Sequence, residues 1–423
     1  MVRTRITRVT TKKLLSRKQR PYALSNQQYM RLQRLGLAGR DLAFCIAVAS
    51  FLKVAVPAAV IHHLDRLDDA RRDLLAMPHF CRLPRNTRSH KFTSVEAALH
   101  ELHYQVHEFQ DIFKFSPSQV KVLGTLLLPD GFETPGHGRL GTEEAMLMLL
   151  AALRHRYRNK NALGRTLDRD PDNLWRHVNR MVDMLDEKFR SLFDVRMLPI
   201  HAHGHLESWK SAVKTLFSQK FPAMQFPQYL DGVCFILDGM RQALTSSGFF
   251  GVEESTYSAY TGQNDLVWGV LLSAQGMIVA LIGPFTGRHN DITFITPVLA
   301  EKVLQIGGKV LADSIFPKRD WLVPLPTRAD QENMGIADNQ VAASSALRMP
   351  VEWEIGAVQS AFPLPFDGAL NKVLQSNVTA RMRVSFLLYN LHVLMNGNET
   401  SRYFNLLQDV SPASYLARVH QHW

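Results

Sequence analysis

Acidic residues follow two short apolar runs in the C-terminal half of this 423-residue sequence. The run 233–237 leads directly into Asp238, and Asp313 lies in a later run, 308–316. A third acid, Glu352, belongs to the segment RMPVEWEIGAVQSAF, whose apolar residues recur at helical spacing. If these three carboxylates converge, their repulsion raises at least one pKa unless a divalent cation neutralises them.

Such a group of acids predicts a particular chemistry. Carboxylate oxygens are hard ligands, which favour Mg²⁺ or Mn²⁺. Two such ions roughly 3.5–4 Å apart can activate a water or a 3′-hydroxyl and stabilise the leaving oxygen of a phosphodiester. The expected reaction is therefore an in-line displacement at phosphorus that depends on two Mg²⁺ or Mn²⁺ ions.

Each acid also has a structural interpretation. Asp238 precedes a glycine, which is a common start of a turn, and Asp313 could begin a turn as well. Asp291 stands where a helix is expected to begin, so that capping is its default role. Glu352 and Glu354 flank the apolar stripe of their helix on opposite sides, and the helical pattern does not choose between them.

The chain after residue 206 supplies the elements that must position the acids. Its short apolar runs predict five strands, at 233–239, 266–276, 277–287, 308–316 and 320–326. The Gln275-Gly276 step indicates a hairpin, and 291–308 reads as a helix closed by a glycine pair. Hairpins followed by helix, strand and helix predict a mixed α/β sheet, in which the first and fourth strands can be neighbours.

A second pattern lies upstream, in residues 142–193. A short helix over 161–167 meets a turn at 168–170, and Pro171 suits the first position of a longer helix. The longer helix has an apolar stripe, and Arg176 and Arg180 lie off that stripe. This is a helix-turn-helix outline, which makes both arginines candidates for DNA contact, although any helical bundle contains such pairs.

Net charge is concentrated at the N-terminus. Residues 1–40 hold eleven of the 49 Lys and Arg residues and no Asp or Glu, which equals the whole net charge of +11. Such an arm suits a polyanion such as nucleic acid or a nuclear import receptor. A solvated tail without a specific partner and a mitochondrial presequence, also basic and poor in acids, stay open as alternatives. The arm lacks the apolar region of a secretory signal.

Other classes of protein fit the sequence less well. The most apolar stretch, 43–61, is interrupted by Lys53 and Pro57, so it does not read as a membrane span. The three cysteines are far apart and have no zinc-finger spacing, which fits a reducing compartment. His201, His203 and His205 recur at period two and would share one face of a strand. That pattern resembles the HxH strand of amidohydrolases, a remote alternative in which His201 and His203 bind metal, whereas a surface linker is simpler.

Several motifs resemble, in the same order, those of the Harbinger-type (PIF-like) DDE transposases, which are related in catalytic fold to RNase H and retroviral integrases. They are LDG at 237–239, YSAYTG at 257–262, GPFTGRHND at 283–291, LADS at 311–314 and RMPVEWEIGAV at 348–358. The resemblance covers roughly residues 108–400. It implies an RNase H-like mixed-sheet catalytic domain preceded by an all-helical, helix-turn-helix-like domain.

The resemblance also implies roles for residues. The aspartates of the family fall on Asp238 and Asp313, and its glutamate falls on Glu352, because Gly356 follows at the spacing of the signature. These three are the expected catalytic residues and metal ligands. Asp291 matches a further acid of the metal site, and its capping role stays open.

Departures from the family pattern lie close to the acids. Met240 stands where Thr is usual, Ile315-Phe316 replaces a frequent Gly-Tyr, and Gln359 occupies a position where Lys often follows the signature. Losing that Lys removes a phosphate contact but no carboxylate. A host-adopted DNA-binding protein of transposase descent, without catalysis, is therefore an alternative.

The expected protein is a nuclear, Mg²⁺-dependent transposase or endonuclease that acts on double-stranded DNA. Arg288 and His289, beside Asp291, are candidates for phosphate contact. A Myb-like accessory DNA-binding protein is implied by the resemblance only, and homodimerisation is left open. The expected parts are a basic disordered arm (1–40), a helical N-terminal region (41–107), a helical DNA-binding domain (108–200), a nuclease domain (206–395) and a C-terminal tail (396–423).

Overall fold

The computed structural model describes residues 92–421 except 104, 135–137, 155–159, 247–249, 335 and 372–376. The basic arm expected over 1–40 lies outside the described residues, as does most of the helical region expected over 41–107. All described residues fall within one compact unit. Among them, no helix is long and apolar enough to cross a membrane.

The first half of the described chain is mainly helical. Its elements are α4 (Val95–Glu101), α5 (Val106–Phe113), α6 (Pro117–Leu127), β1 (Phe132–Thr134), β2 (Gly138–Leu140), α7 (Thr142–Arg154), α8 (Lys160–Thr166), α9 (Pro171–Phe189), α10 (Leu198–Ala202) and α11 (Leu206–Lys220). Short 3₁₀ turns at Arg190–Phe193, Val195–Met197 and Gln228–Leu230 join some of them. Helix α7 is buried along nine consecutive residues, 145–153, so it forms the centre of this half.

Helices α8 and α9 lie where the sequence predicts them. Asp168 turns the chain with φ of +49°, and the Asp170 carboxylate accepts a hydrogen bond from the Asn173 N–H at 3.0 Å, which caps α9. Pro171 occupies the first turn, where its missing N–H leaves no helix bond unmade. The predicted apolar stripe is buried. The short helix, the turn and the longer helix are therefore present, whereas a helix-turn-helix domain and its contact with DNA stay predictions.

A mixed sheet forms the second half. Its strands are β3 (Val233–Ala243), β4 (Tyr257–Ser258), β5 (Gln263–Ser273), β6 (Ile278–Thr286), β7 (Lys309–Ala312) and β8 (Leu322–Pro324). β3, β5 and β6 are joined by antiparallel pairing, whereas β7 and β8 continue the sheet parallel to β3. The predicted five strands, the hairpin at Gly276 and the pairing of the first with the fourth strand are confirmed.

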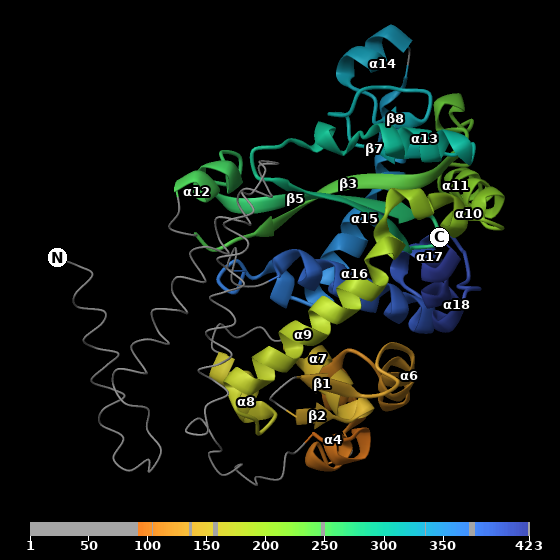
Figure 1. Cartoon of the computed structure of the whole chain (residues 1–423). Coiled ribbons are helices and arrows are strands. Elements are labelled where there is room, and N and C mark those ends of the chain that lie inside the picture. The colour runs from red at the N-terminus through yellow and green to blue at the C-terminus, as the bar shows by residue number, and fades with distance from the viewer. Residues whose placement is uncertain are drawn as a thin grey trace, which may run out of the picture. The chain divides into compact units, whose positions relative to one another are not determined.

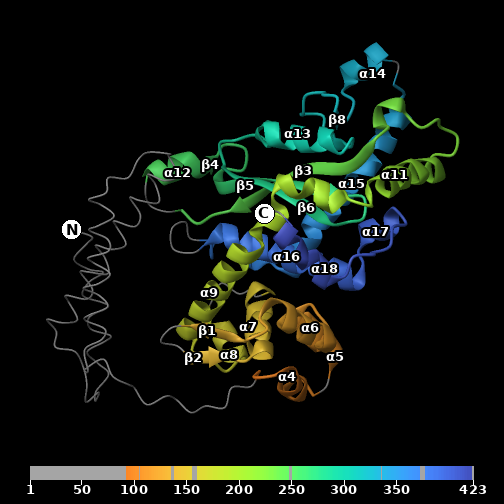
Figure 2. The same ribbon diagram turned by 45° about the vertical axis from the view of Figure 1, so that its right-hand side comes forward.

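Helices cover both faces of the sheet. They are α12 (Phe250–Thr256), α13 (Pro297–Gln305), α14 (Arg328–Met334), α15 (Asp338–Ala361), α16 (Val378–Asn396), α17 (Glu399–Tyr403) and α18 (Pro412–Ala417). In both ribbon views α13 lies on one side of β3 and β5, whereas α15 and α16 lie on the other (Figures 1 and 2). This mixed α/β arrangement is consistent with an RNase H-like domain.

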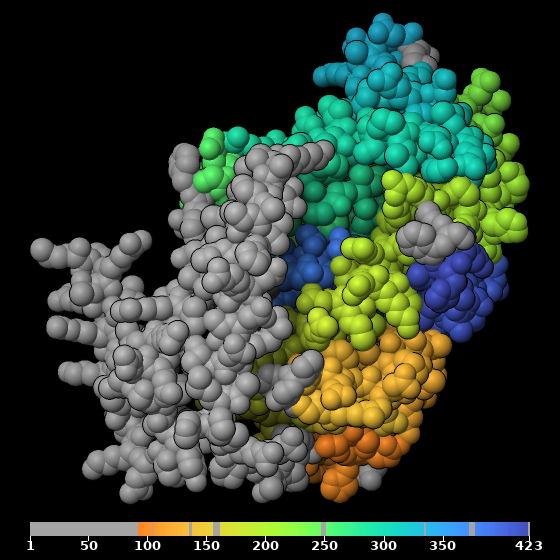
Figure 3. All heavy atoms as spheres, in the orientation of Figure 1, coloured from red at the N-terminus to blue at the C-terminus, as the bar shows by residue number. Residues whose placement is uncertain are grey.

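The long helix α9 connects the two halves. It packs along α16, where the guanidinium of Arg383 donates from Nε and Nη2 to the two oxygens of Asp186, each at 2.6 Å. Arg381 donates to the Asn179 side chain at 2.8 Å. Residues of α9 and of the blue C-terminal part are in contact on the surface (Figure 3). Bidentate arginine pairs of this kind fix orientation as well as distance.

Candidate active site

Strand register places the two aspartates at matching positions of neighbouring strands, with Asp238 in the middle of β3 and Asp313 just beyond β7. In the parallel pair of β3 and β7, Ile236 stands opposite Leu311. Asp238 and Asp313 each lie two residues beyond this pair, so the strands deliver both acids to matching positions. Asp313 comes directly after β7, and its Oδ1 accepts a hydrogen bond from the Ser314 N–H at 2.7 Å. The expectation that the first and fourth strands bring these acids together holds for their backbone positions.

Helix α15 brings Glu352 close to Asp238, and an arginine joins it to the strand. The Nη1 of Arg348 lies 3.1 Å from the Oδ2 of Asp238, and its Nη2 pairs with the Glu352 carboxylate. Residues four apart lie on one face of a helix, so Arg348 and Glu352 project together. Sequence reasoning missed Arg348, although its spacing of four residues from Glu352 was visible.

A proline lies between these two residues without breaking the helix. Pro350 has no N–H, so the carbonyl of Ala346 loses its helical donor. The hydroxyl of Tyr403 donates to that carbonyl at 3.0 Å and replaces the missing hydrogen bond. The contact from α17 therefore stabilises α15 next to the site.

Glu354 points away from the site. Its side chain is buried, and its carboxylate accepts hydrogen bonds from the hydroxyls of Tyr389 on α16 and Thr400 on α17. Glu352, in contrast, is 39 % exposed and close enough to Asp238 to raise its pKa. Geometry thus separates the two glutamates that the helical pattern left equivalent, while the catalytic role of Glu352 stays a prediction.

Asp291 approaches the same strand from the other face. A Cβ built on Gly239 would lie 2.8 Å from the Oδ1 of Asp291, and one on Gly269 would lie 2.8 Å from the Phe294 ring. Gly239 and Gly269 are paired on neighbouring strands. Because successive side chains of a strand alternate between faces, this glycine pair admits the turn Asp291–Phe294 on the face opposite to Arg348.

The expected cap at Asp291 is wrong. The helix predicted over 291–308 begins at Pro297 as α13, and its cap is Thr296, whose hydroxyl accepts from the Leu299 N–H at 3.1 Å. Asp291 instead opens a short 3₁₀ turn that has no side-chain cap. A Pro at the first helical position, preceded by Thr, is the stronger start signal.

Burial shapes the electrostatics of both pairs of acids. Burial raises the pKa of Asp238, an effect that the nearby Arg348 opposes and Glu352 reinforces. Burial likewise raises the pKa of Asp291, with Arg241 opposing and Asp313 reinforcing the shift. Two acidic pairs therefore exist, Asp238 with Glu352 and Asp291 with Asp313. A cation placed beside either pair would reduce the repulsion between its two carboxylates.

The donor set fits a hard divalent cation in its chemistry. The two acidic pairs, Asp238 with Glu352 and Asp291 with Asp313, offer only carboxylate oxygens as ligands. Among the described residues, however, no three acidic, histidine or cysteine side chains are grouped closely enough to hold a metal as they stand. The guanidinium of Arg348 contacts both Asp238 and Glu352, so it already supplies positive charge between them.

Other residues of the sequence motifs have structural roles. Arg241 donates to Asp265 at 3.2 Å and to the Ser258 hydroxyl at 2.9 Å. Thr261 donates to the same buried Asp265 at 2.8 Å, and Gly287 lies so close that a Cβ there would be 2.4 Å from Oδ1 of Asp265. The YSAYTG and GPFTGRHND motifs thus meet around one buried ion pair.

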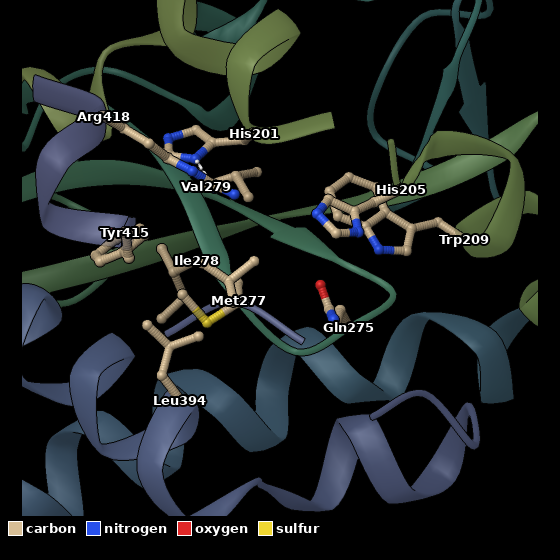
Figure 4. A pocket seen from close by; sticks show the side chains of 11 residues that line it. His201, His205, Trp209, Gln275, Met277, Ile278, Val279, Leu394, Tyr415 and Arg418 are labelled. Atoms are coloured by element: carbon tan, nitrogen blue, oxygen red, sulfur yellow. Dashed lines mark hydrogen bonds between the residues drawn. The ribbon is translucent and has the colours of Figure 1, made fainter. Parts of the chain in front are cut away.

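The histidine alternative is wrong, because no strand forms there. His201 belongs to helix α10, and His205 precedes α11. His201 is buried, its Nε2 is 2.9 Å from the Leu192 carbonyl, and Arg418 lies 2.9 Å from its Nδ1. Figure 4 shows Arg418 directed at His201 across from His205 and Trp209. The cavity between them, about 10 Å³, has room for about one water.

The candidate DNA contacts lie in three places. Arg176 and Arg180 are exposed on α9. Arg288 pairs with Glu254 at 2.8 Å, and the Nδ1 of His289 is 3.0 Å from the Thr286 hydroxyl. Both residues follow β6 and precede Asp291. Their contact with DNA stays a prediction.

A groove beside Asp313 was not predicted. It has a volume of about 950 Å³ and runs along β7, β8 and the start of α14. Its lining includes Ser314, Lys309, Lys318 and Arg319. Asp330, which also lines it, accepts hydrogen bonds from the N–H and hydroxyl of Thr327, the residue before α14, and its own N–H donates to the Thr327 hydroxyl. The basic pair Lys318-Arg319 lies five and six residues after Asp313. This pair is the sequence signal that could have located this surface.

Comparison with known proteins supports a nuclease domain in this part of the chain. Residues 237–390 match the family model described as DDE superfamily endonuclease. Neither curated proteins nor solved structures gave a match. The matched segment begins one residue before Asp238 and contains Asp291, Asp313 and Glu352. DDE endonuclease domains generally use divalent metal ions and act on DNA. The match therefore supports a DDE transposase family for residues 237–390.

Proposed function

We propose that this chain is a Mg²⁺-dependent DNA transposase or endonuclease of the Harbinger type, which acts in the nucleus. The observation that supports the proposal is that β3 and β7 place Asp238 and Asp313 at matching backbone positions, and that Arg348 joins Asp238 to Glu352. All three acids lie inside the segment that matches the endonuclease family. A water would hydrolyse one strand at the end of the element and liberate a 3′-hydroxyl. That hydroxyl would then attack a phosphodiester of the target DNA.

In this proposal each acid has a role that follows from its position in the fold. Asp238 and Asp313 would hold the ions from adjacent strands, and Glu352 would complete the site from α15. Asp291, on the other face of β3, would be a further ligand for the ion that Asp313 binds. Bound divalent ions would polarise the phosphodiester and make the attacking oxygen more nucleophilic. The half-exposed Glu352 is open to solvent and can orient that oxygen.

DNA would lie across the groove beside Asp313. Lys309, Lys318 and Arg319 line this groove and would contact phosphates there, although the charge of Lys318, after the hydrogen bonds from Thr327, also lowers the pKa of Asp330. Lys309 would thus add a third cation to the basic pair Lys318-Arg319. Arg176, Arg180, Arg288 and His289 are the other proposed contacts, and the N-terminal arm would add affinity that does not depend on DNA sequence.

The test is a nicking assay on DNA that carries the flanking repeats. The full chain should nick with Mg²⁺ and lose the activity with EDTA, and Asp313→Asn should lower the rate by about 10³-fold or more, because one ligand of the reacting centre is neutralised. Asp320→Asn, a carboxylate in the same groove, is the matched control and should nick like wild type. Equal rates for wild type and Asp313→Asn would end the catalytic assignment.

A second candidate function is DNA binding without catalysis. It is favoured by Arg348, whose guanidinium stands between two of the three acids, and by the substitutions at Met240 and Gln359. Binding and nicking measured side by side separate the candidates: both should bind DNA with or without EDTA, whereas only the first should nick it with Mg²⁺ and lose that activity with EDTA. A partner of Myb type and a homodimer belong to the proposal and are open to the same binding assay.

A further inference from the structure

Arg348 makes an unusual ion pair for a residue so well buried. It is 16 % exposed and contacts two carboxylates, those of Asp238 and Glu352, through its two terminal nitrogens. Its Nε is buried without a hydrogen-bond partner among the described residues. One guanidinium therefore neutralises two carboxylates, and its Nε–H donates no hydrogen bond to any residue that the structure describes.

A second buried arginine shows what a structural pair looks like here. Arg383 uses both Nε and Nη2 on the single carboxylate of Asp186, at 2.6 Å each. Such fork-to-fork geometry satisfies the guanidinium and holds the two helices in place. Arg348 lacks this geometry, because its fork is split between a strand and its own helix. The contacts of Arg348 therefore neutralise the charges of the two acids rather than hold β3 and α15 in one orientation.

We propose that Arg348 is a resident counter-ion that competes with divalent cations for Asp238 and Glu352. In the cation-free protein it keeps two carboxylates from repelling each other across the gap between β3 and α15. A cation that binds these carboxylates must displace the guanidinium first. The inference rests on the proposed function, since it assigns Arg348 a role toward the metal site of that function.

Binding of Mn²⁺ to the full-length protein tests the competition without any catalytic readout. Free Mn²⁺ is measured by electron paramagnetic resonance during titration of wild type, Arg348→Gln and Arg196→Gln, the last an exposed arginine in an ion pair with Asp194. Arg348→Gln should bind Mn²⁺ about tenfold more tightly, because no guanidinium has to leave. Arg196→Gln should bind like wild type.

Melting temperatures measured in parallel separate this role from a purely structural one. Without Mn²⁺, Arg348→Gln should melt lower than wild type, because the two acids then repel; with saturating Mn²⁺ the difference should disappear. Should Arg348→Gln not fold, Arg348→Lys serves instead and should bind about threefold more tightly than wild type, because an ammonium keeps the charge but cannot bridge two acids as the guanidinium fork does. In Arg348→Gln, adding Asp238→Asn should remove the gain.

The possible outcomes are distinct. Equal or weaker Mn²⁺ binding by the folded Arg348 variants, beside measurable binding by wild type, would overturn the competition and leave the proposed function standing. Absence of Mn²⁺ binding in wild type and variants alike would overturn both. Tighter binding that the second substitution, Asp238→Asn, does not reverse would place the gain at another site and also overturn the inference.

Discussion

Helix α15 places two glutamates, two residues apart, in opposite environments. Glu354 is 1 % exposed and receives hydroxyl donors from two other helices. Glu352 is partly exposed and shares one guanidinium with Asp238. Burial raises the pKa of Glu354, against the hydrogen bonds that lower it. The two carboxylates are chemically identical, and their surroundings make one a packing element and the other a candidate reactive group.

The difference teaches how to distinguish structural from functional acids. A buried polar group whose hydrogen bonds are complete stabilises one arrangement of the chain. A group that faces another charge of the same sign, with one shared counter-ion, costs stability and is kept at sites that bind something. By this criterion Asp265, held by Arg241 and Thr261, belongs with Glu354, whereas Asp238 belongs with Glu352.

Glu354→Ala should have the largest effect on stability. It leaves the hydroxyls of Tyr389 and Thr400 buried without an acceptor, and each such loss costs about 1–3 kcal/mol. The free energy of unfolding in urea should fall by about 3 kcal/mol. Glu352→Ala, two residues away, should change it by less than about 1 kcal/mol. Similar decreases in the free energy of unfolding for both variants would contradict the assignment of Glu354 to structure and of Glu352 to the site.

His201 sharpens the comparison through pH, because it too is a buried polar group with complete contacts. Burial, with the charge of Arg418, lowers its pKa to about 4, whereas an unfolded histidine titrates near about 6.5. The unfolded chain thus takes up the proton first, so stability is lost as pH falls from about 6.5 to about 4, by about 3 kcal/mol in total.

The measurement is urea unfolding of wild type, His201→Gln and His203→Gln between pH 7.5 and 4. His203 is exposed and serves as the control. Its substitution should leave the pH dependence as in wild type. His201→Gln should make it shallower, and the remaining slope includes the contribution of His392, whose pKa burial also lowers to about 4. An unchanged slope in His201→Gln would show that this imidazole is not held neutral by the fold.

Gly239→Ala tests the side of the site opposite to Glu352. The added Cβ would lie 2.8–2.9 Å from all three carboxyl atoms of Asp291, so that the acid must move. Nicking should fall by about tenfold to a hundredfold, as expected when a reacting group shifts by about 1 Å. Gly356→Ala, where no atom lies within 4 Å, is the control and should stabilise α15 by about 0.5–1 kcal/mol.

Arg180→Ala should have the smallest effect. If α9 contacts phosphate, removing one contact lowers the slope of log affinity against log salt by about 1 and weakens binding to all sequences alike. Arg196→Ala, also an exposed arginine, should leave the slope unchanged. Identical salt dependence for Arg180→Ala and wild type would remove α9 from the DNA surface.

Much of the backbone arrangement could be predicted from the sequence. The strands of the sheet and the α8–α9 pair follow from local apolar periodicity, which short segments carry by themselves. The capping role of Asp291 was wrong because the local start signal Thr296-Pro297 was overlooked, whereas its approach to Gly239 depends on packing between distant elements. Arg348 and the groove at Lys318 were missed for a related reason: which side chains share a space is decided by packing between distant elements.

The most direct test compares nicking by Glu352→Gln and Glu354→Gln, each measured per folded molecule with Mg²⁺ and the flanking repeats. The account predicts that Glu352→Gln loses about a hundredfold or more, because the carboxylate at the reacting centre is neutralised. Glu354→Gln keeps a rate within about threefold of wild type, since its side chain contacts α16 and α17 instead. Retained nicking by Glu352→Gln, or equal losses in both, would contradict the assignment of the chemistry to Glu352 and its neighbouring acids.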